Sequence, residues 1–515
     1  MAELLTALTD TDTKRCHLGD ARFDSARFAE DATFRGARFL GGAWFYGTKF
    51  VGDAWFDRAE FFGEVWFDWA KFSGDASFDR AKFADDARFQ HTRFSGGASF
   101  EKAKFSSDAV FSAAKFGVAL FGAQFGGAEF SGYAGFDGVT FRGSVEFRGA
   151  KFEAAPQLGP LLCLGGVDLS GAVFGSPVII EVAATYVHCN LTRWNSTATL
   201  RLRCATVDLS NAVIEHPMAI TSHPTPFTVY SAPALDESAL TDCDKPVRVI
   251  SVRGADTAHL VLTDVDLTEC QFVGAFHLDQ LRLAGRCTFA SAPTGFHWRH
   301  LLPCRWTSRR TLVEEHYWRA RSPGNPARGW TSAAGDGPVP ADLAPIYRQL
   351  RKSFEDGKNE PDAADFYYGE MEMRRHDKGR PSAERALVLL YWAFSGYGLR
   401  ASRALLWLVL AMAATVMALM AWGLPTLAPL PAATGTLTSS HISLRTDRPD
   451  LSIAGDRLTI QRADRAARVA VNAVVFRTSG QNLTRAGTYI EMASRIFEPI
   501  LLALAVLAVR GRVKR

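Results

Sequence analysis

The sequence predicts a mainly β chain, a parallel β-solenoid followed by a helical hairpin and two transmembrane helices. Three observations predict the solenoid. Phenylalanine recurs at alternating steps of five and six residues between Phe23 and Phe152. Alanine, threonine or valine stands two residues before each of the 25 phenylalanines in this series. The same stretch is dense in glycine, as at Gly36, Gly41 and Gly47. An internal repeat of this regularity defines a repeat architecture.

An α-helix is the alternative for an eleven-residue period, and two arguments exclude it. At about 100° per residue, steps of five and six residues place alternate phenylalanines on nearly opposite sides of a helix. Each glycine costs about 1 kcal/mol in a helix interior. In a solenoid, phenylalanine and the small residue two places earlier share the inward face of one strand. We therefore expect coils of 22 residues, with one coil of 20 where the steps become 5, 4, 5 and 6 between Phe116 and Phe136.

The units "ARFDS", "AKFSG" and "AKFAD" resemble those of the pentapeptide-repeat proteins, which have a central phenylalanine or leucine and a small residue two positions earlier. The resemblance covers residues 21–152. It implies a right-handed quadrilateral parallel β-helix, although the alternation of five and six departs from the unbroken five of the family. It implies almost nothing about chemistry.

Five segments follow in order: an N-terminal cap (1–20), the regular β-helix (21–155), an irregular β-helix continuation (156–300), a helical linker and hairpin (301–384), and a membrane region (385–515). The continuation rests on three related phrases, "VDLSGAVF", "VDLSNAVI" and "VDLTECQF". The first begins at Val167 and the second at Val207, a spacing that fits two coils. A separate β-sandwich is the alternative for 156–300.

The bulk composition excludes several classes of protein. The net charge is +4 on 58 basic and 54 acidic side chains, too small to indicate nucleic-acid binding by itself. The eight cysteines lie far apart, without a CxxC pair, which argues against a zinc site and favours buried free thiols in the core. The N-terminus lacks a signal-peptide pattern, so we expect the solenoid in the cytosol.

Helical patterns appear at 309–320, 342–357 and 362–376, and the last two resemble the hairpin that precedes the membrane segments of membrane-anchored pentapeptide-repeat proteins. Residues 385–403 are aromatic-rich with basic ends and suit a membrane interface. Residues 404–424 carry no charge and are long enough to span a bilayer. The second span, 487–509, includes Glu491, Arg495 and Glu498. These three lie either at the headgroup level or in a bundle interior as a polar cluster.

Basic residues predict the orientation of the spans. Arg400 and Arg403 precede the first span, whereas four basic residues follow the second between positions 510 and 515. The positive-inside rule places both termini in the cytoplasm, with residues 425–485 outside. We therefore expect a multi-pass protein of the plasma membrane, with the lipid bilayer as one partner and homo-oligomers through the membrane helices as a further expectation.

A candidate interaction surface comes from the residue that precedes alternate phenylalanines. With the expected coil length, Arg27, Lys49, Lys71, Arg93 and Lys115 stack at intervals of about 4.8 Å. Tryptophans recur nearby at eleven-residue steps, at Trp44, Trp55 and Trp66. Such a stripe suits anionic headgroups, nucleic acid or an acidic protein. The alternative is a solvated face neutralised by acidic residues of the same repeats, namely Asp57, Asp68, Asp79 and Glu101.

Residues 20–155 hold 17 basic and 19 acidic side chains, so nucleic acid is not expected as a partner, nor is the strongly acidic surface of DNA-mimicking pentapeptide-repeat proteins. No catalytic, nucleotide-binding or cofactor motif appears, and no cofactor or metal is expected. The sequence "ARVAVNAVVFRTSGQNLTRAG" resembles the pore-helix region of two-span ion channels, but "RTSGQN" stands where a filter such as TVGYG would be. We expect a non-enzymatic membrane-anchored scaffold for an unidentified protein partner or a membrane surface. A degenerate channel or channel regulator is second, and a membrane-associated enzyme third.

Overall fold

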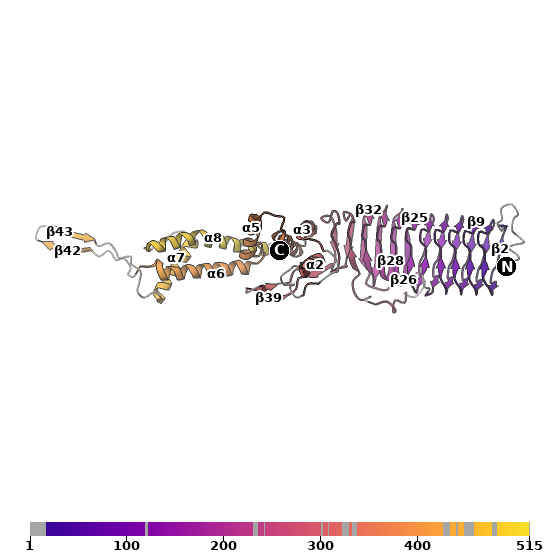
Figure 1. Ribbon diagram of the computed structural model, residues 1–515, viewed down its shortest axis with the longest axis horizontal. Helices are drawn as coiled ribbons and strands as arrows, with labels where there is room; N and C mark the ends of the chain where they lie inside the picture. The colour runs from indigo at the N-terminus through magenta and orange to yellow at the C-terminus, as the bar shows by residue number, and fades with distance from the viewer. Residues whose placement is uncertain are drawn as a thin grey trace. The chain divides into compact units, whose positions relative to one another are not determined.

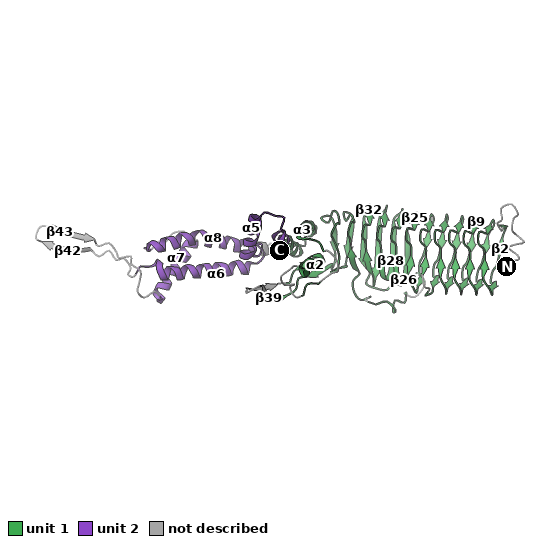
Figure 2. Ribbon diagram, viewed as in Figure 1, with its two compact units in different colours: residues 1–370 green, residues 371–515 purple. Residues whose placement is uncertain are grey.

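The computed structural model describes residues 17–118, 122–229, 235–241, 243–299, 302–306, 308–321, 329–331, 337–425, 433–438, 441–446, 458–475 and 482–513. The chain divides into two compact units, residues 1–370 and 371–515 (Figures 1 and 2). Unit 1 contains a β-solenoid of about 12 turns, whose first described strand begins at His17. Unit 2 is mainly helical. Most of the predicted N-terminal cap lies outside the described residues.

Four two-residue strands make up each coil of the regular part, and each strand pairs in parallel with its equivalent in the next coil. The first row is β1 (His17–Leu18), β5 (Arg38–Phe39), β9 (Glu60–Phe61), β13 (Lys82–Phe83), β17 (Lys104–Phe105), β21 (Glu129–Phe130), β25 (Lys151–Phe152), β27 (Val173–Phe174), β29 (Arg193–Trp194) and β32 (Val213–Ile214). The second row is β2 (Ala21–Arg22), β6 (Ala43–Trp44), β10 (Val65–Trp66), β14 (Ala87–Arg88), β18 (Ala109–Val110) and β22 (Ala134–Gly135).

The third row of strands is β3 (Arg27–Phe28), β7 (Lys49–Phe50), β11 (Lys71–Phe72), β15 (Arg93–Phe94), β19 (Lys115–Phe116) and β23 (Thr140–Phe141). The fourth row is β4 (Ala32–Thr33), β8 (Ala54–Trp55), β12 (Ala76–Ser77), β16 (Ala98–Ser99), β20 (Ala123–Gln124) and β24 (Val145–Glu146). Figure 1 shows these rows as stacked short arrows. The predicted β-solenoid is therefore confirmed, while its right-handed quadrilateral form stays a prediction.

Stacked phenylalanine rings fill the core of the regular coils. Phe45, Phe67 and Phe89 are fully buried, and their ring centroids lie 4.6 and 5.0 Å apart in consecutive coils. Each ring also meets rings of the neighbouring stack edge to face, as Phe67 does with Phe56 at 5.3 Å. Offset stacking and edge-to-face contact are the favourable geometries for aromatic pairs. The small residue two places before each phenylalanine, most often alanine, leaves space for these rings.

The predicted coil length holds through most of the regular part, where Lys71 pairs with Arg93. The shorter coil predicted near Phe116 is wrong. Phe116 stacks on Phe141, and Lys115 pairs with Thr140, so the coil there is longer instead. The sequence separation between hydrogen-bonded neighbours in adjacent coils rises from 22 to 25. Phe121 misled the prediction because it keeps a five-residue step from Phe116; it lies outside the described residues.

The solenoid continues beyond residue 156 with longer strands and mostly shorter coils. Asp168 pairs with His188, which pairs with Asp208, so the two "VDLS" phrases lie two coils apart as predicted. The strands are β26 (Gln157–Asp168), β28 (Val178–His188), β30 (Ala198–Arg203), β31 (Thr206–Asp208), β33 (Met218–Ser222), β34 (Arg248–Ser251), β35 (Leu260–Thr263), β36 (Asp266–Leu267), β37 (Arg282–Ala284) and β38 (Thr288–Ser291). Their pairings with one another are parallel, which excludes the β-sandwich alternative.

The cysteines correct one expectation. Cys163, Cys189, Cys270 and Cys287 are buried free thiols, as predicted. Cys204 and Cys243, however, form a disulfide across 39 residues, because the long connection from β33 to β34 folds back onto the solenoid. Cys16 and the side chain of Cys304 lie outside the described residues.

The solenoid ends where β38 pairs antiparallel with β41 (Arg310–Thr311). A hairpin of β39 (Gly295–Arg299) and β40 (Leu302–Trp306) precedes it. Three helices follow: α2 (Val313–Arg321), α3 (Pro340–Asp356) and α4 (Glu360–His376). The helix predicted from 309 begins at Val313 instead, because Arg310 and Thr311 are taken up by the strand pairing. The predicted hairpin of α3 and α4 is present.

Unit 2 contains α5 (Ser382–Ser395), α6 (Ala401–Ala418), a π-helical turn η1 (Leu419–Gly423), α7 (Ile460–Val475) and α8 (Arg485–Val513), with a hairpin of β42 (Ala433–Thr438) and β43 (His441–Thr446). Two helical stretches, Ala401–Gly423 and Arg485–Val509, are long and apolar enough to cross a membrane. They correspond to the predicted spans 404–424 and 487–509. The backbones of these two stretches approach each other closely at Gly423 and Gly487. A Cβ added to Gly487 would lie 2.4 Å from the carbonyl oxygen of Gly423.

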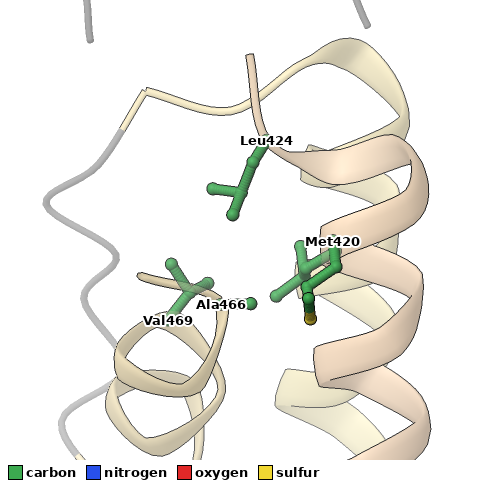
Figure 3. Packing of buried hydrophobic residues seen from close by; sticks show 5 residues of the cluster. Met420, Leu424, Ala466 and Val469 are labelled. Atoms are coloured by element: carbon green, nitrogen blue, oxygen red, sulfur yellow. The ribbon is translucent and has the colours of Figure 1, made fainter. Parts of the chain in front are cut away.

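A small apolar cluster joins α7 to the end of the first of these stretches. Met420 and Leu424 pack with Ala466 and Val469 of α7, and all four are buried (Figure 3). Arg462, also on α7, is buried nearby and donates hydrogen bonds to backbone carbonyl oxygens of this end. The acceptors are Met420 (2.9 Å), Leu424 (2.8 Å) and Pro425 (3.1 Å). Because the last carbonyls of a helix lack partners within it, this arginine caps the end.

Candidate interaction surfaces

The predicted ladder of cations is present on the third row of strands. Cα pairing joins Arg27 to Lys49, Lys49 to Lys71, Lys71 to Arg93, and Arg93 to Lys115. We call these five residues the basic row. All five side chains are exposed to solvent, and adjacent members of parallel strands lie about 4.8 Å apart. The row ends where Lys115 pairs with Thr140 in the longer coil.

Among the residues that the structure describes, no member of the basic row forms an ion pair or a side-chain hydrogen bond. Their positive charges therefore face water and one another. Like charges directly opposite in neighbouring strands are destabilising, so the fold gains nothing from this arrangement.

A second line of charged residues lies on the first row of strands, and carboxylates neutralise its cations. We call it the mixed row; it consists of Arg38, Glu60, Lys82, Lys104, Glu129 and Lys151. Glu60 accepts from Arg38 at 3.0 Å and from Lys82 at 3.1 Å. Glu129 accepts from Lys104 at 2.7 Å and from Lys151 at 3.0 Å, and these two lysines lower the pKa of Glu129. Every cation of the mixed row thus has a carboxylate in an adjacent coil.

The acidic residues predicted to neutralise the basic row serve elsewhere. Asp57 pairs with Arg35 at 2.8 Å, and Asp68 pairs with Arg88 at 3.0 Å. Asp79 accepts hydrogen bonds from the backbone N–H of Glu101 and from Ser99. Among the described residues, no ion pair joins Asp57, Asp68, Asp79 or Glu101 to the basic row, so the neutralised-face interpretation has no direct contact to support it.

Three aspartates stand at the next corner of the coil after members of the basic row. Asp31 follows Arg27, Asp53 follows Lys49, and Asp75 follows Lys71. Each of these aspartates accepts a hydrogen bond from a backbone N–H of the following coil, at 2.7 to 2.9 Å. The donors are Asp53 for Asp31, Asp75 for Asp53, and Gly97 for Asp75. These carboxylates hold the corners of successive coils together. They make no ion pair with the basic row among the described residues.

The three predicted tryptophans do not join the basic row. Trp44 and Trp66 pair with each other on the second row of strands, whereas Trp55 lies on the fourth row. Each indole is covered by an arginine at 4.4 to 4.9 Å from the ring centroid; the arginines are Arg22, Arg35 and Arg88. Cation–π contacts of this kind stabilise the outer surface of the coils. The eleven-residue step is half a coil, so it alternates between two rows of strands.

Sequence reasoning missed a different aromatic pair that lies next to the basic row in the chain. Trp69 and His91 occupy the same corner of consecutive coils, two residues before Lys71 and Arg93, and their rings stack at 4.2 Å. Trp69 is 52% exposed. Both residues adopt a left-handed backbone, with φ of 61° and 56°, at the corner where Gly47 stands one coil earlier. Their separation by one coil length is the sequence signal that predicts this stack.

The predicted polar cluster of the second span is divided into two parts. Arg495 pairs with Glu491 one helical turn away, at 2.7 Å. Glu498 is fully buried and accepts hydrogen bonds from Thr415 of α6 at 2.7 Å and from Ser494 at 2.9 Å. Glu498 therefore lies between helices, as the bundle-interior interpretation predicted. The depth of Glu491 and Arg495 in a bilayer stays a prediction.

Buried charges also connect the end of the solenoid to α2 and α3. The carboxylate of Glu315 accepts hydrogen bonds from Arg309 (2.5 Å), Arg319 (2.6 Å) and Tyr347 (2.5 Å). Burial alone would raise the pKa of Glu315, but the two arginines and the tyrosine outweigh it and lower that pKa to about 2. Burial raises the pKa of Glu314 to about 7, against opposing hydrogen bonds from the backbone N–H of Phe272 and Val273.

A polar recess beside α2 offers the nearest resemblance to a catalytic arrangement. It is lined in part by Asp208, Ser210, Ser251 and His316. The two serine hydroxyls lie 2.8 Å apart, and Ser210 donates to Asp208 at 2.6 Å. The imidazole of His316 is hydrogen-bonded to Thr311 at 2.9 Å rather than to a serine. A nucleophilic serine needs a hydrogen bond to the histidine that acts as its base, so the recess gives no support to the enzyme hypothesis.

Comparison with known proteins agrees with the repeat. Residues 14–60 and 56–104 match the family model of pentapeptide repeats (9 copies). No curated protein and no solved structure matches the chain. Solenoids of such repeats are typically non-catalytic and commonly serve as structural or interaction scaffolds.

Proposed function

We propose that this pentapeptide-repeat solenoid is a membrane-anchored, non-enzymatic scaffold whose basic row binds an acidic segment of a partner protein. The observation that carries the proposal is the contrast between five exposed cations without carboxylate partners and the neighbouring mixed row, in which every cation is paired. Charges that do not stabilise the fold are available to a partner, and complementary charge gives specificity and fast association.

The geometry of the basic row favours an acidic protein over a lipid surface or nucleic acid. The row is one residue wide, and Asp31, Asp53 and Asp75 follow it at the next corner. A broad anionic surface would meet these aspartates as well as the cations. A narrow acidic segment can lie along the row alone and reach the exposed ring of Trp69 beside Lys71.

The anchor rests on how little of the two apolar helical stretches is buried. Only 22% and 28% of their most apolar 18-residue segments are buried in the structure, whereas the core helix of a soluble protein is mostly buried. Large apolar side chains face outward on both, including Leu406, Val409, Phe497 and Leu507. Lipid is the solvent that suits such faces. The basic residues beside the spans support cytoplasmic termini in the plasma membrane.

A site-specific crosslinker tests the partner proposal. A photoreactive residue at Ser73, exposed two residues after Lys71, is compared with one at Ala84, exposed two residues after Lys82 of the mixed row. We expect a covalent protein adduct from Ser73 in cells that produce the full chain, and little from Ala84. Equal yields from both positions, or no adduct from Ser73, would contradict the proposal.

The membrane anchor has its own test. Membranes from producing cells are washed with alkaline carbonate, which releases peripheral proteins. The full chain should stay in the pellet. Release into the supernatant would refute the anchor without bearing on the basic row.

The second candidate, a degenerate two-span channel or channel regulator, is supported by α7, which packs against both α6 and α8. The segment expected to hold a filter lies mostly outside the described residues. Liposomes that contain the purified chain should show no conductance if the scaffold proposal is right. Conductance that disappears on Glu491→Ala would favour the channel instead.

A further inference from the structure

The connection between β33 and β34 brings three metal-ligand side chains together on the flank of the solenoid. Cys204 directly follows β30, whereas Glu237 and Cys243 belong to the connection. The two Sγ atoms and a carboxylate oxygen of Glu237 all lie within 4.8 Å of one another. In the structure the two cysteines are joined as a disulfide, and both are partly accessible to solvent.

One oxygen of Glu237 has no partner among the described residues. The side chain of Glu237 is 7% exposed, and its Oε2 accepts from Nε of the equally buried Arg203 at 2.8 Å. Its Oε1 is buried without a hydrogen bond. A buried carboxylate oxygen left without a donor is costly, so it indicates a missing ligand.

The surroundings hold these groups in place. Arg203 also donates to the backbone carbonyl of His223 at 2.8 Å, so a single side chain fixes both the start of the connection and Glu237 within it. Phe227 and Leu240 pack on Leu162 and Ala183 of the solenoid, next to both cysteines. The three ligand groups therefore lie at the edge of an apolar cluster, where water competes less for a cation.

We propose that Cys204, Cys243 and Glu237 form a zinc site when the disulfide is reduced. Thiolate and carboxylate are both zinc ligands, and three protein ligands leave a fourth position for water. The site thus has two forms, a disulfide and a zinc-bound dithiolate, and the connection is held to the solenoid in both.

The interconversion balances in atoms and electrons. Two molecules of a low-molecular-weight thiol reduce the disulfide, giving the two cysteine thiols and the oxidised disulfide of the reductant. Zn²⁺ then replaces the two thiol protons, which are released to water. Two thiolates and one carboxylate carry a charge of −3, and Zn²⁺ with Arg203 carries +3. The filled site is neutral, as a partly buried site should be.

Zinc titration of the full chain in detergent, under a phosphine reductant, tests the site. The probe is Zn²⁺ alone in competition with a chromophoric chelator, and Co²⁺ reports thiolate ligation by its charge-transfer absorption. We expect one Zn²⁺ per chain, no binding after Cys243→Ser, and at least about tenfold weaker binding after Glu237→Gln, the loss that even an outer-shell change typically causes.

Glu181→Gln is the matched control, because Glu181 also pairs with an arginine, Arg201, on the solenoid surface but has no cysteine beside it. Its zinc affinity should equal that of the wild type. Circular dichroism of each variant confirms that the solenoid is folded. A reduced wild-type chain that binds no zinc, binding that survives Cys243→Ser, or equal affinity in Glu237→Gln would each overturn the proposal.

Discussion

The basic row and the mixed row are built from the same repeat unit and differ in one respect. In both, a charged residue precedes an inward-facing phenylalanine and pairs in register with its equivalent one coil away. Glu60 and Glu129 interrupt the mixed row and neutralise the cations on either side. The basic row has no such interruption between Arg27 and Lys115. The same fold therefore carries one charged row whose cations are paired with carboxylates, the mixed row, and one that stays positive, the basic row.

The comparison of the two rows indicates that the repeat uses different positions for stability and for surface charge. Phenylalanine stacks and backbone ladders hold the coils together, so we expect the residue before each phenylalanine to contribute little to folding. Variation at that position changes the surface without changing the core.

The shared core should be far more sensitive than either row. Phe67→Ala removes a fully buried ring that stacks on Phe45 and Phe89, and we expect a loss of about 3–5 kcal/mol in the free energy of unfolding. Denaturant unfolding followed by circular dichroism measures it. Leu40→Ala, at a 52% exposed position, is the control and should change stability by less than about 0.5 kcal/mol. Similar losses in both variants would contradict a phenylalanine core.

A buried ion network should behave differently from the exposed mixed row. Glu315→Gln leaves Arg309 and Arg319 without their carboxylate, and we expect a loss of about 3–5 kcal/mol. The pKa of Glu315 is lowered to about 2, below its ordinary value of 4.5, so its stabilisation is present above pH 4.5 and is lost as the pH falls toward 2. Thermal unfolding across this range should show that loss in the wild type.

The pH dependence of the Glu315→Gln variant completes the test. The variant should lose less stability than the wild type between pH 4.5 and 2, because the titrating carboxylate is gone. Identical pH profiles for the two proteins would show that Glu315 contributes nothing through its charge.

Glu60→Gln should convert part of the mixed row into a second basic surface. Arg38 and Lys82 lose their carboxylate, yet stability should fall by less than about 1 kcal/mol because both cations are partly exposed. A crosslinker at Ala84, expected to give little adduct in the wild type, should then capture the partner. An unchanged yield from Ala84 would mean that charge alone does not define the binding surface.

Neutralising the basic row should barely affect folding. Lys49→Gln, Lys71→Gln and Arg93→Gln combined remove like charges stacked about 4.8 Å apart. We expect a change in unfolding free energy within about 0.5 kcal/mol, toward higher stability, by denaturant unfolding. A clear destabilisation would show that these side chains have a structural role.

The sequence predicted the solenoid and the stacking of the basic row because both follow from one period. It failed where a change in length or a distant contact decides the outcome. Phe121 keeps the expected step although the coil around it is longer than its neighbours. Cys204 and Cys243 are 39 residues apart and come together only because the connection after β33 folds back onto the solenoid.

The partners of surface charges were predicted less well than the rows. Asp57 and Asp68 occur in the same repeats as the basic row, but the coil carries them to other strands, where they pair with Arg35 and Arg88. Proximity in the sequence is a poor guide to proximity across a corner. Glu498 lies at a helix interface because Thr415 of α6, distant in the sequence, donates to it, a contact that sequence spacing does not predict.

One measurement tests the central proposal most directly. Two triple variants each remove three positive charges, from the basic row (Lys49→Gln, Lys71→Gln, Arg93→Gln) or from the mixed row (Lys82→Gln, Lys104→Gln, Lys151→Gln). The yield of the protein adduct from the crosslinker at Ser73 is compared in otherwise identical cells. We expect at least about a tenfold loss for the basic-row variant and less than about a twofold change for the mixed-row variant. Equal losses in both, or an undiminished adduct in the basic-row variant, would contradict the assignment of the basic row as the binding surface.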